Sequence, residues 1–215
     1  LFHAPSRSCV MNFDAHAGAI VSVAYSPEEG RNFISGSHDG MIRTWDSVNY
    51  SATLTSFHCD YSPPVCCARF SPNGKYLLVS TLDDNIRLFP ADDNVGPESI
   101  GPVVKPPPGS AKTAVANQYR YEPLKTYKGH KQGNYTMQTA FFSGDLSSAT
   151  GKKGDTTKLV VSGSEDNLIY LWDADSMETQ QTLEGHTDVA LAVACNPDES
   201  MLQIASASVD KTVKL

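Results

Sequence analysis

The stretch VSGSEDNLIYLWD, Val161 to Asp173, decides the fold because three related stretches recur along the chain. The related stretches are SGSHDGMIRTWD (35–46), VSTLDDNIRLFP (79–90) and SASVDKTVKL (206–215). Each has a run of apolar or small residues, a short polar turn with an aspartate, and then alternating apolar and polar residues. This pattern is typical of a β-hairpin. Its recurrence indicates a repeat architecture.

The spacing of the turn aspartates defines the repeats. The aspartates are Asp39, Asp83, Asp166 and Asp210; the first and last intervals are both 44 residues, and the middle one is 83. The middle interval therefore holds one repeat plus insertions. We predict one domain, 1–215, with units at about 14–57, 58–127, 128–183 and 184–215, the last of them cut short.

A histidine precedes three of the hairpins: His16 in FDAHAGAIVSVAYSP, His130 in YKGHKQGNYTMQTAFF and His186 in LEGHTDVALAVACNP. An alternating segment follows each histidine, so every unit supplies about four short strands. The second unit has SPPVCCARFSPNGKY and no histidine at this place. An all-β fold with Gly-His and Trp-Asp signatures in a unit of about 40 to 45 residues indicates a β-propeller.

These stretches resemble the WD-repeat (WD40) family over essentially the whole chain. The family closes its ring with seven blades, so the resemblance implies that the about four blades here are roughly the C-terminal half of a ring, completed by residues absent from this sequence or by a partner. The stretch SRSCVMNF looks like the last strand of a preceding blade, and the sequence ends at Leu215, one residue before an expected tryptophan. The resemblance also implies a buried hydrogen-bonded network in each blade, formed by a histidine, a strand hydroxyl, the turn aspartate and a tryptophan. The matching residues are His16, Asp39, Trp45, Asp83, His130, Asp166, Trp172, His186 and Asp210, with Ser35 or Ser37, Ser162 or Ser164, and Ser206 or Ser208 as hydroxyls. Phe89 replaces the tryptophan of the second unit, so we expect an incomplete network there.

The network also has a physical reason, since a buried carboxylate is stable only when donors satisfy it. A serine, a histidine and an aspartate can form an acyl-transfer triad, but that chemistry needs one exposed nucleophile beside an oxyanion hole. Near-copies of the set spaced like the fold indicate a structural role. We therefore expect no enzyme activity and no cofactor.

Composition narrows the function further. The 215 residues carry a net charge of -7, which disfavours direct binding to nucleic acid or to an anionic membrane. No apolar run approaches the ~20 residues of a membrane helix. The five cysteines show no CxxC spacing, so we expect reduced thiols in the nucleus or cytosol and no metal site.

Two insertions interrupt the repeats. The first, 91–121, contains KPPPGS, and the second, 143–157, is rich in small polar residues; both are expected to be loops, the first a mobile one. Because the strands of a blade alternate in direction, both loops should leave the same rim. They are either tolerated surface segments or partner-docking loops.

The stretches PPVCCARFSPNGKYLLVSTLDDNIRLF, PLKTYKGHK, VSGSEDNLIYLWD and LEGHTDV resemble, more closely, the WD-repeat scaffold subunits of COMPASS- or MLL-type histone H3 methyltransferase complexes. This resemblance implies a nuclear, non-enzymatic subunit that binds other protein subunits of a complex methylating histone H3 at its lysine-four position. The alternative is a WD-repeat adaptor in ubiquitin-ligase substrate recruitment, RNA processing or signalling, with a cytoplasmic location.

The resemblance also implies a central-channel site that takes an arginine side chain, from histone H3 or another peptide, between aromatic rings. The matching positions are His38, Cys66, Cys67, Tyr135, Thr136 and Gln138. Only Tyr135 keeps an aromatic ring of the family, while Cys67 and Gln138 stand where phenylalanines are expected. Ring faces are needed to hold a guanidinium. The channel is therefore either an arginine-peptide site or a lined channel without this use.

On the opposite rim, the resemblance implies a docking cleft for a second partner subunit. The matching residues are Asn73, Tyr76, Leu88, Lys125 and Phe141. The alternative is that Tyr76, Leu88 and Phe141 pack inside the blades, because sequence alone does not separate exposed from buried apolar residues.

Overall fold

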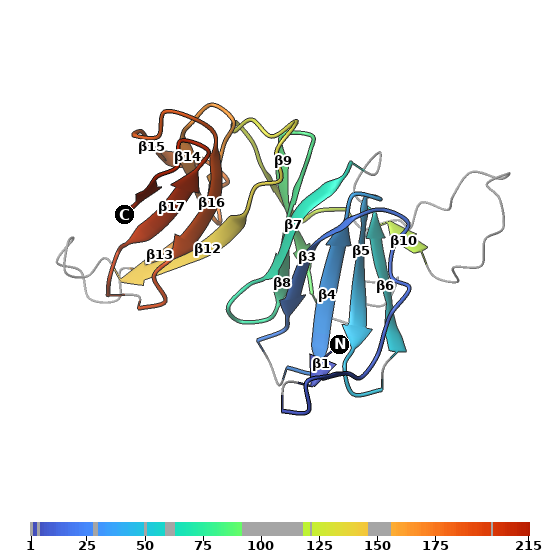
Figure 1. Ribbon diagram of the computed structural model, residues 1–215. Helices are drawn as coiled ribbons and strands as arrows, with labels where there is room; N and C mark the ends of the chain where they lie inside the picture. The colour runs from blue at the N-terminus through green and yellow to red at the C-terminus, as the bar shows by residue number, and fades with distance from the viewer. Residues whose placement is uncertain are drawn as a thin grey trace, which may run out of the picture.

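The computed structural model of the chain describes residues 2–3, 5–27, 30–49, 51–58, 63–91, 118–120, 122–145, 156–198 and 200–215. The regular structure in these ranges is all β (Figure 1). Four of the five sheets follow one another along the chain and form four blades. The fifth is a two-stranded antiparallel sheet of β1 (Phe2–His3) and β2 (Ser8–Cys9). The predicted all-β fold with about four blades is confirmed.

The four blades share a core of three or four strands that follow their order in the chain and pair antiparallel. Blade 1 contains β3 (Ile20–Tyr25), β4 (Asn32–Ser37), β5 (Met41–Asp46) and β6 (Ser51–His58). Blade 2 contains β7 (Val65–Phe70), β8 (Tyr76–Thr81), β9 (Asn85–Pro90) and β11 (Lys125–Tyr127). Blade 3 contains β12 (Thr139–Asp145), β13 (Thr156–Gly163), β14 (Ile169–Asp173) and β15 (Thr179–Leu183). Blade 4 contains β16 (Ala190–Cys195), β17 (Ile204–Ser208) and β18 (Val213–Lys214).

The turn between the second and third strand of each blade explains the recurring aspartate. In blades 1, 3 and 4 the aspartate accepts a hydrogen bond from the backbone N–H two residues later, an Asx turn that fixes the hairpin. The residue in between has a positive φ in all four blades: Gly40, Asp84, Asn167 and Lys211. Glycine, aspartate and asparagine tolerate this conformation well.

The core lies between neighbouring blades. Leu77 and Val79 of β8 pack against Ile34 and Ile42 of blade 1, whereas Leu78 faces blade 3. Successive residues of a strand point to opposite faces, so one strand supplies two cores. The cluster between blades 2 and 3 contains Leu78, Ile86, Leu88, Tyr127, Val160 and Trp172. The cluster between blades 3 and 4 contains Phe142, Leu159, Val161, Ile169, Leu171, Ala190 and Val193.

Parts of the two insertions are strands, contrary to the expectation of loops throughout. β10 (Gln118–Arg120) pairs parallel with β6 and adds a fifth strand to blade 1. β12 extends to Asp145 and β13 begins at Thr156, so the second insertion is shorter than 143–157. Residues 92–117, 121 and 146–155, where the rest of both insertions falls, lie outside the described residues.

Both insertions leave the blades at one end of the molecule. The first begins after Pro90, the register partner of Tyr76 at the start of β8, and returns before β11. At the same end, Lys125 of blade 2 donates from Nζ to the carbonyl oxygen of Ala174 in the turn after β14, at 2.8 Å. Because the Asp145 end of β12 pairs with the start of β13, the second insertion opens on this rim as well.

Gly163 allows the close approach of blades 3 and 4. A Cβ atom at Gly163 would lie 2.1 Å from the carbonyl oxygen of Ala190 in β16, a contact that backbone atoms do not tolerate. We expect Gly163→Ala to lower the free energy of unfolding by roughly 1–3 kcal/mol, measured by urea denaturation. Gly133→Ala is the matched control, because nothing lies within 4 Å of its Cβ position. Equal stability of the two variants would contradict tight packing between these blades.

Candidate functional site

Blade 1 contains a complete chain of hydrogen bonds through the predicted residues. Trp45 Nε1 donates to Ser35 Oγ at 2.8 Å, and the Ser35 hydroxyl lies 2.7 Å from His16 Nε2. His16 Nδ1 lies 3.1 Å from the carboxylate of Asp39. The hydroxyl in this series of hydrogen bonds is that of Ser35, while Ser37 Oγ accepts from the backbone N–H of Asp39. These hydrogen bonds connect the loop before β3 to the hairpin of the same blade.

Blade 4 repeats this arrangement. His186 Nδ1 lies 2.8 Å from Asp210 Oδ2, and its Nε2 lies 2.9 Å from Ser206 Oγ. Ser208, like Ser37, accepts from the backbone N–H of the turn aspartate. The strand hydroxyl is therefore the one four residues before the aspartate in both blades.

The electrostatics of the blade 1 network favour a neutral His16 beside an ionised Asp39. Burial lowers the pKa of His16, although Asp39 acts in the opposite sense. Burial alone would raise the pKa of Asp39, but hydrogen bonds from the backbone of Ala17 and Met41 and from His16 hold it below its ordinary value. The pKa of Asp210 is also lowered, first by the Thr212 hydroxyl.

The serines of these networks are not placed to act as nucleophiles. Ser35 and Ser206 are buried, at 3% and 7% exposure, and their hydroxyls are engaged within the blade. Within the described ranges no three His, Cys, Asp or Glu residues gather as a metal-binding group. The described residues also contain no helix long and apolar enough to span a membrane.

In blade 2 an arginine contacts the turn aspartate, which a histidine contacts in blades 1 and 4. Arg87 donates to Asp83 Oδ1 at 3.1 Å and to Thr81 Oγ1 at 2.6 Å. Burial would raise the pKa of Asp83, yet the hydrogen bonds from Arg87 and Thr81 lower it. Phe89, in place of tryptophan, is fully buried in the core between blades 1 and 2.

Blade 3 does not form the expected network of His130, Asp166 and Trp172. Asp166 Oδ2 accepts instead from the Tyr170 hydroxyl at 2.8 Å. Trp172 Nε1 donates to the carbonyl oxygen of Lys128 at 2.9 Å, and Ser162 donates to the carbonyl oxygen of Gly163.

The reason for the difference in blade 3 is the side chain four residues after the turn aspartate. Blades 1 and 2 have Arg43 and Arg87 at this position, whereas Tyr170 in blade 3 is long enough to bind Asp166 itself. His130 packs edge-on against Trp172, with ring centroids 5.4 Å apart, and lies 3.3 Å from Gln132 Oε1 through Nε2. Tyr170 stacks on Trp172 from its own strand.

Three buried polar atoms near this network have no hydrogen-bond partner among the described residues. They are His130 Nδ1, Gln132 Nε2 and Thr139 Oγ1. An unpaired buried group destabilises the folded state. Burial lowers the pKa of His130, because it disfavours the charged imidazolium.

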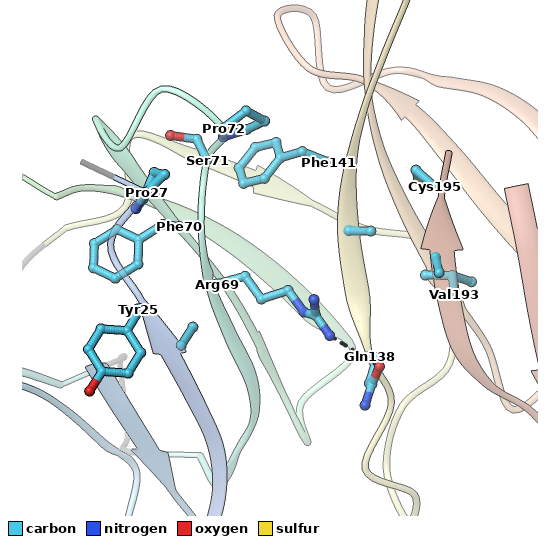
Figure 2. A pocket seen from close by; sticks show the side chains of 13 residues that line it. Tyr25, Pro27, Arg69, Phe70, Ser71, Pro72, Gln138, Phe141, Val193 and Cys195 are labelled. Atoms are coloured by element: carbon cyan, nitrogen blue, oxygen red, sulfur yellow. Dashed lines mark hydrogen bonds between the residues drawn. The ribbon is translucent and has the colours of Figure 1, made fainter. Parts of the chain in front are cut away.

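We call the first strand of each blade its inner strand. These four strands, β3, β7, β12 and β16, line a cavity of about 430 Å³ (Figure 2). A second cavity of about 230 Å³ shares Ala24, Arg69 and Gln138 with it. Four of the six predicted channel residues line the second cavity: Cys66, Cys67, Thr136 and Gln138. His38 and Tyr135 are exposed and line neither cavity. The structure therefore does not bring the one retained aromatic ring, that of Tyr135, to either cavity.

The predicted rim residues do not form one exposed surface. Leu88 is 7% exposed in the core between blades 2 and 3, because β9 buries this face against blade 3, as the alternative of packing inside the blades expects. Phe141 is half-buried against the same core and also lines the larger cavity beside Pro72 (Figure 2). Tyr76 is 38% exposed.

The two polar residues of the predicted rim are engaged in local contacts. Asn73 Oδ1 accepts from the Ser71 hydroxyl and the backbone N–H of Lys75 within the turn after β7. Lys125 Nζ donates to Ala174 and lies 2.9 Å from Asp175 Oδ1, which joins blades 2 and 3 at this end.

Arg69, which the sequence reasoning missed, is the charged residue of both cavities. It lies on β7 opposite Leu78 in the register. Leu78 lies five residues before the turn aspartate of blade 2. In the other blades, the residues that pair with this position are Ala24, Ala140 and Ala194. Aligning the inner strands through their hairpin partners would have revealed it.

The geometry defines a repeat protein of β-blades joined by buried packing. Comparison with protein families gives the class: the family model "WD domain, G-beta repeat" matches residues 7–46, 51–89, 121–173 and 177–215. The chain belongs to the WD40 repeat family. Proteins of this family are typically non-catalytic scaffolds that mediate protein–protein interactions.

Among curated proteins, the chain is similar to several WD-repeat proteins of different function. It is 24% identical over 211 residues to pre-mRNA-processing factor 17 of Homo sapiens, covering 98% of this chain and 30% of that protein. It is 27% identical over 198 residues to the COMPASS component SWD3 of Saccharomyces cerevisiae, covering 87% and 53%. It is 25% identical over 208 residues to the guanine nucleotide-binding protein subunit beta of Solanum tuberosum, covering 88% and 54%. The chain thus spans about half of these relatives or less.

The turn aspartates of blades 1 and 3 differ in the hydrogen bonds that they accept. Asp39→Ala leaves His16 and the backbone N–H groups of Ala17 and Met41 without an acceptor. We expect a loss of about 1–3 kcal/mol in the free energy of unfolding. Asp166→Ala, which affects only Leu168 and a half-buried tyrosine hydroxyl, should lose less than about 1 kcal/mol. Urea denaturation measures both, and a larger loss for Asp166→Ala would contradict the assignment.

Acidification is expected to destabilise the chain through buried histidines. The pKa values of His16 and His130 are lowered from 6.5 in the fold. Below that value the unfolded chain binds protons that the folded chain does not, so the free energy of unfolding falls as the pH falls. The lowered pKa values of the aspartates act only near and below 3.8.

The measurement is urea denaturation at about pH 7.5 and about pH 5.5. His130→Leu should reduce the pH dependence. Stability that is equal or greater at the lower pH would refute this account.

Proposed function

We propose that the chain is a non-enzymatic interaction scaffold of a COMPASS-type complex that methylates histone H3 at its lysine-four position, located in the nucleus. The stretches PPVCCARFSPNGKYLLVSTLDDNIRLF and PLKTYKGHK support this subfamily, as does the similarity to the COMPASS component SWD3. The observation that carries the proposal is the exposed aromatic ring of Tyr76, at the rim where the resemblance expects a partner subunit.

The rim around Tyr76 has features that suit a protein partner. Tyr76 begins β8, next to the exposed turn residues Asn73 and Lys75, and Leu124 is 55% exposed at the start of blade 2's outer strand. Tyrosine is enriched in interfaces because it presents a large apolar ring with a polar end. Both insertions begin on this rim, and we propose that they extend the docking surface.

We do not assign an arginine-containing peptide, from histone H3 or elsewhere, to the channel. The second cavity presents the thiol-bearing Cys66 and Cys67 and the amide of Gln138, without the ring of Tyr135. Arginine clamping depends on aromatic faces.

The second candidate is an adaptor in RNA processing. It is favoured by the similarity to pre-mRNA-processing factor 17, which extends over 98% of the chain. A signalling adaptor, with a cytoplasmic location, follows in the same way from the similarity to the G-protein β subunit.

Affinity purification of the tagged chain from nuclear extract, followed by mass spectrometry, tests the proposal. We expect methyltransferase core subunits among the captured proteins; splicing factors or G-protein partners in their place would contradict it. Tyr76→Ala should reduce capture of the partner subunit by about tenfold, since a buried interface tyrosine contributes 1–2 kcal/mol or more. Val48→Ala, which trims an exposed apolar side chain of blade 1, is the control and should retain capture. Undiminished capture by Tyr76→Ala would place docking elsewhere.

A further inference from the structure

Arg69 differs from the other arginines whose ion pairs the structure describes. Arg31, Arg43 and Arg87 each pair with an aspartate of their own blade. Arg69 instead donates from Nη2 to the neutral Gln138 Oε1, at 3.2 Å, across the space between β7 and blade 3 (Figure 2). This is its one hydrogen bond among the described residues, and a guanidinium has five N–H donors. Most N–H donors of Arg69 are therefore not bonded to the described residues and can bind a ligand.

The surroundings of Arg69 leave room for a ligand. Ala24, Ala140 and Ala194 line the larger cavity at the register level of Arg69, so three methyl groups stand where blade 2 has a guanidinium. Tyr25, Pro27, Phe70, Pro72 and Phe141 supply apolar and aromatic walls (Figure 2). The cavity can thus accept a side chain together with its apolar neighbours.

The charge of the lining is unbalanced. None of the described residues that line either cavity is an aspartate or a glutamate, although the chain as a whole carries a net charge of -7. Arg69 is solvent-exposed in the cavity lining, and a guanidinium can bind a carboxylate through two parallel hydrogen bonds. It repels an arginine side chain in the same place.

We propose that the cavity binds a carboxylate of an acidic peptide segment from a protein partner, with Arg69 as the anchoring residue and Gln138 holding the guanidinium in position. This inference rests on the proposed function as an interaction scaffold and specifies the chemistry of one partner. It reverses the charge of the ligand that the resemblance implies for a channel site.

Fluorescence anisotropy with fluorescein-labelled peptides tests the proposal on the 215-residue chain. The probes are hexaglutamate amide, hexaglutamine amide, and hexaglutamine with a free C-terminal carboxylate. We expect hexaglutamate to bind and hexaglutamine amide not to bind. Binding of the third peptide would show that a chain-terminal carboxylate also serves. Failure of both carboxylate peptides to bind would overturn the proposal.

Variants locate the binding. Arg69→Gln should weaken hexaglutamate binding about tenfold or more, as expected for the loss of a charge-assisted pair, and Arg69→Lys should weaken it less. Lys128→Gln removes the same charge from an exposed position directly after β11, outside both cavities, and should change binding by less than about twofold. Circular dichroism checks that each variant is folded. Equal losses for Arg69→Gln and Lys128→Gln would mean a general charge effect and would refute the site.

The outcome is separable from that of the proposed function. A chain that captures methyltransferase subunits but does not bind hexaglutamate loses this inference and keeps the proposed complex. A chain that binds hexaglutamate through Arg69 but captures only splicing or signalling proteins keeps this inference and loses the proposed complex.

Discussion

Blades 2 and 3 are small sheets with two apolar faces, and each face is buried against a neighbouring blade, which stabilises the sheet. Leu77 and Val79 face blade 1, while Leu78 between them faces blade 3, so blade 2 depends on both neighbours. This constraint explains the close approach at Gly163 and the small residues in the second strand of several blades.

The residues that the repeats share hold the blades together, and those that differ are available for binding. The His–Ser–Asp chain in blades 1 and 4 ties a loop to a hairpin. In blades 2 and 3 the turn aspartate is bound by Arg87 and Tyr170 instead, so the partner of the aspartate differs among the blades. Arg69 is a residue that differs, because the other blades have alanine at this position. Its charge faces the cavity and has no role in the packing of blade 2.

The sequence was sufficient for the repeats and hairpins, because period and turn chemistry repeat in the residues themselves. It was insufficient where the outcome depends on the reach of a side chain, as with Tyr170, or on which face of a sheet is covered, as with Leu88. β10 was missed because three residues after a proline-rich segment carry no strand pattern. Arg69 was missed because its significance exists only in the register between strands.

Hydrogen–deuterium exchange of the chain tests the dependence on neighbouring blades most directly. β8 and β13 lie in blades flanked on both faces, whereas Val23 and Tyr25 of β3 and Val213 of β18 are at least half exposed. We predict that the backbone amides of β8 and β13 exchange most slowly and that blades 1 and 4 open first, because local stability follows buried contacts. Equal protection across all four blades would show that the blades open together as one unit instead of from the ends, and it would contradict the account.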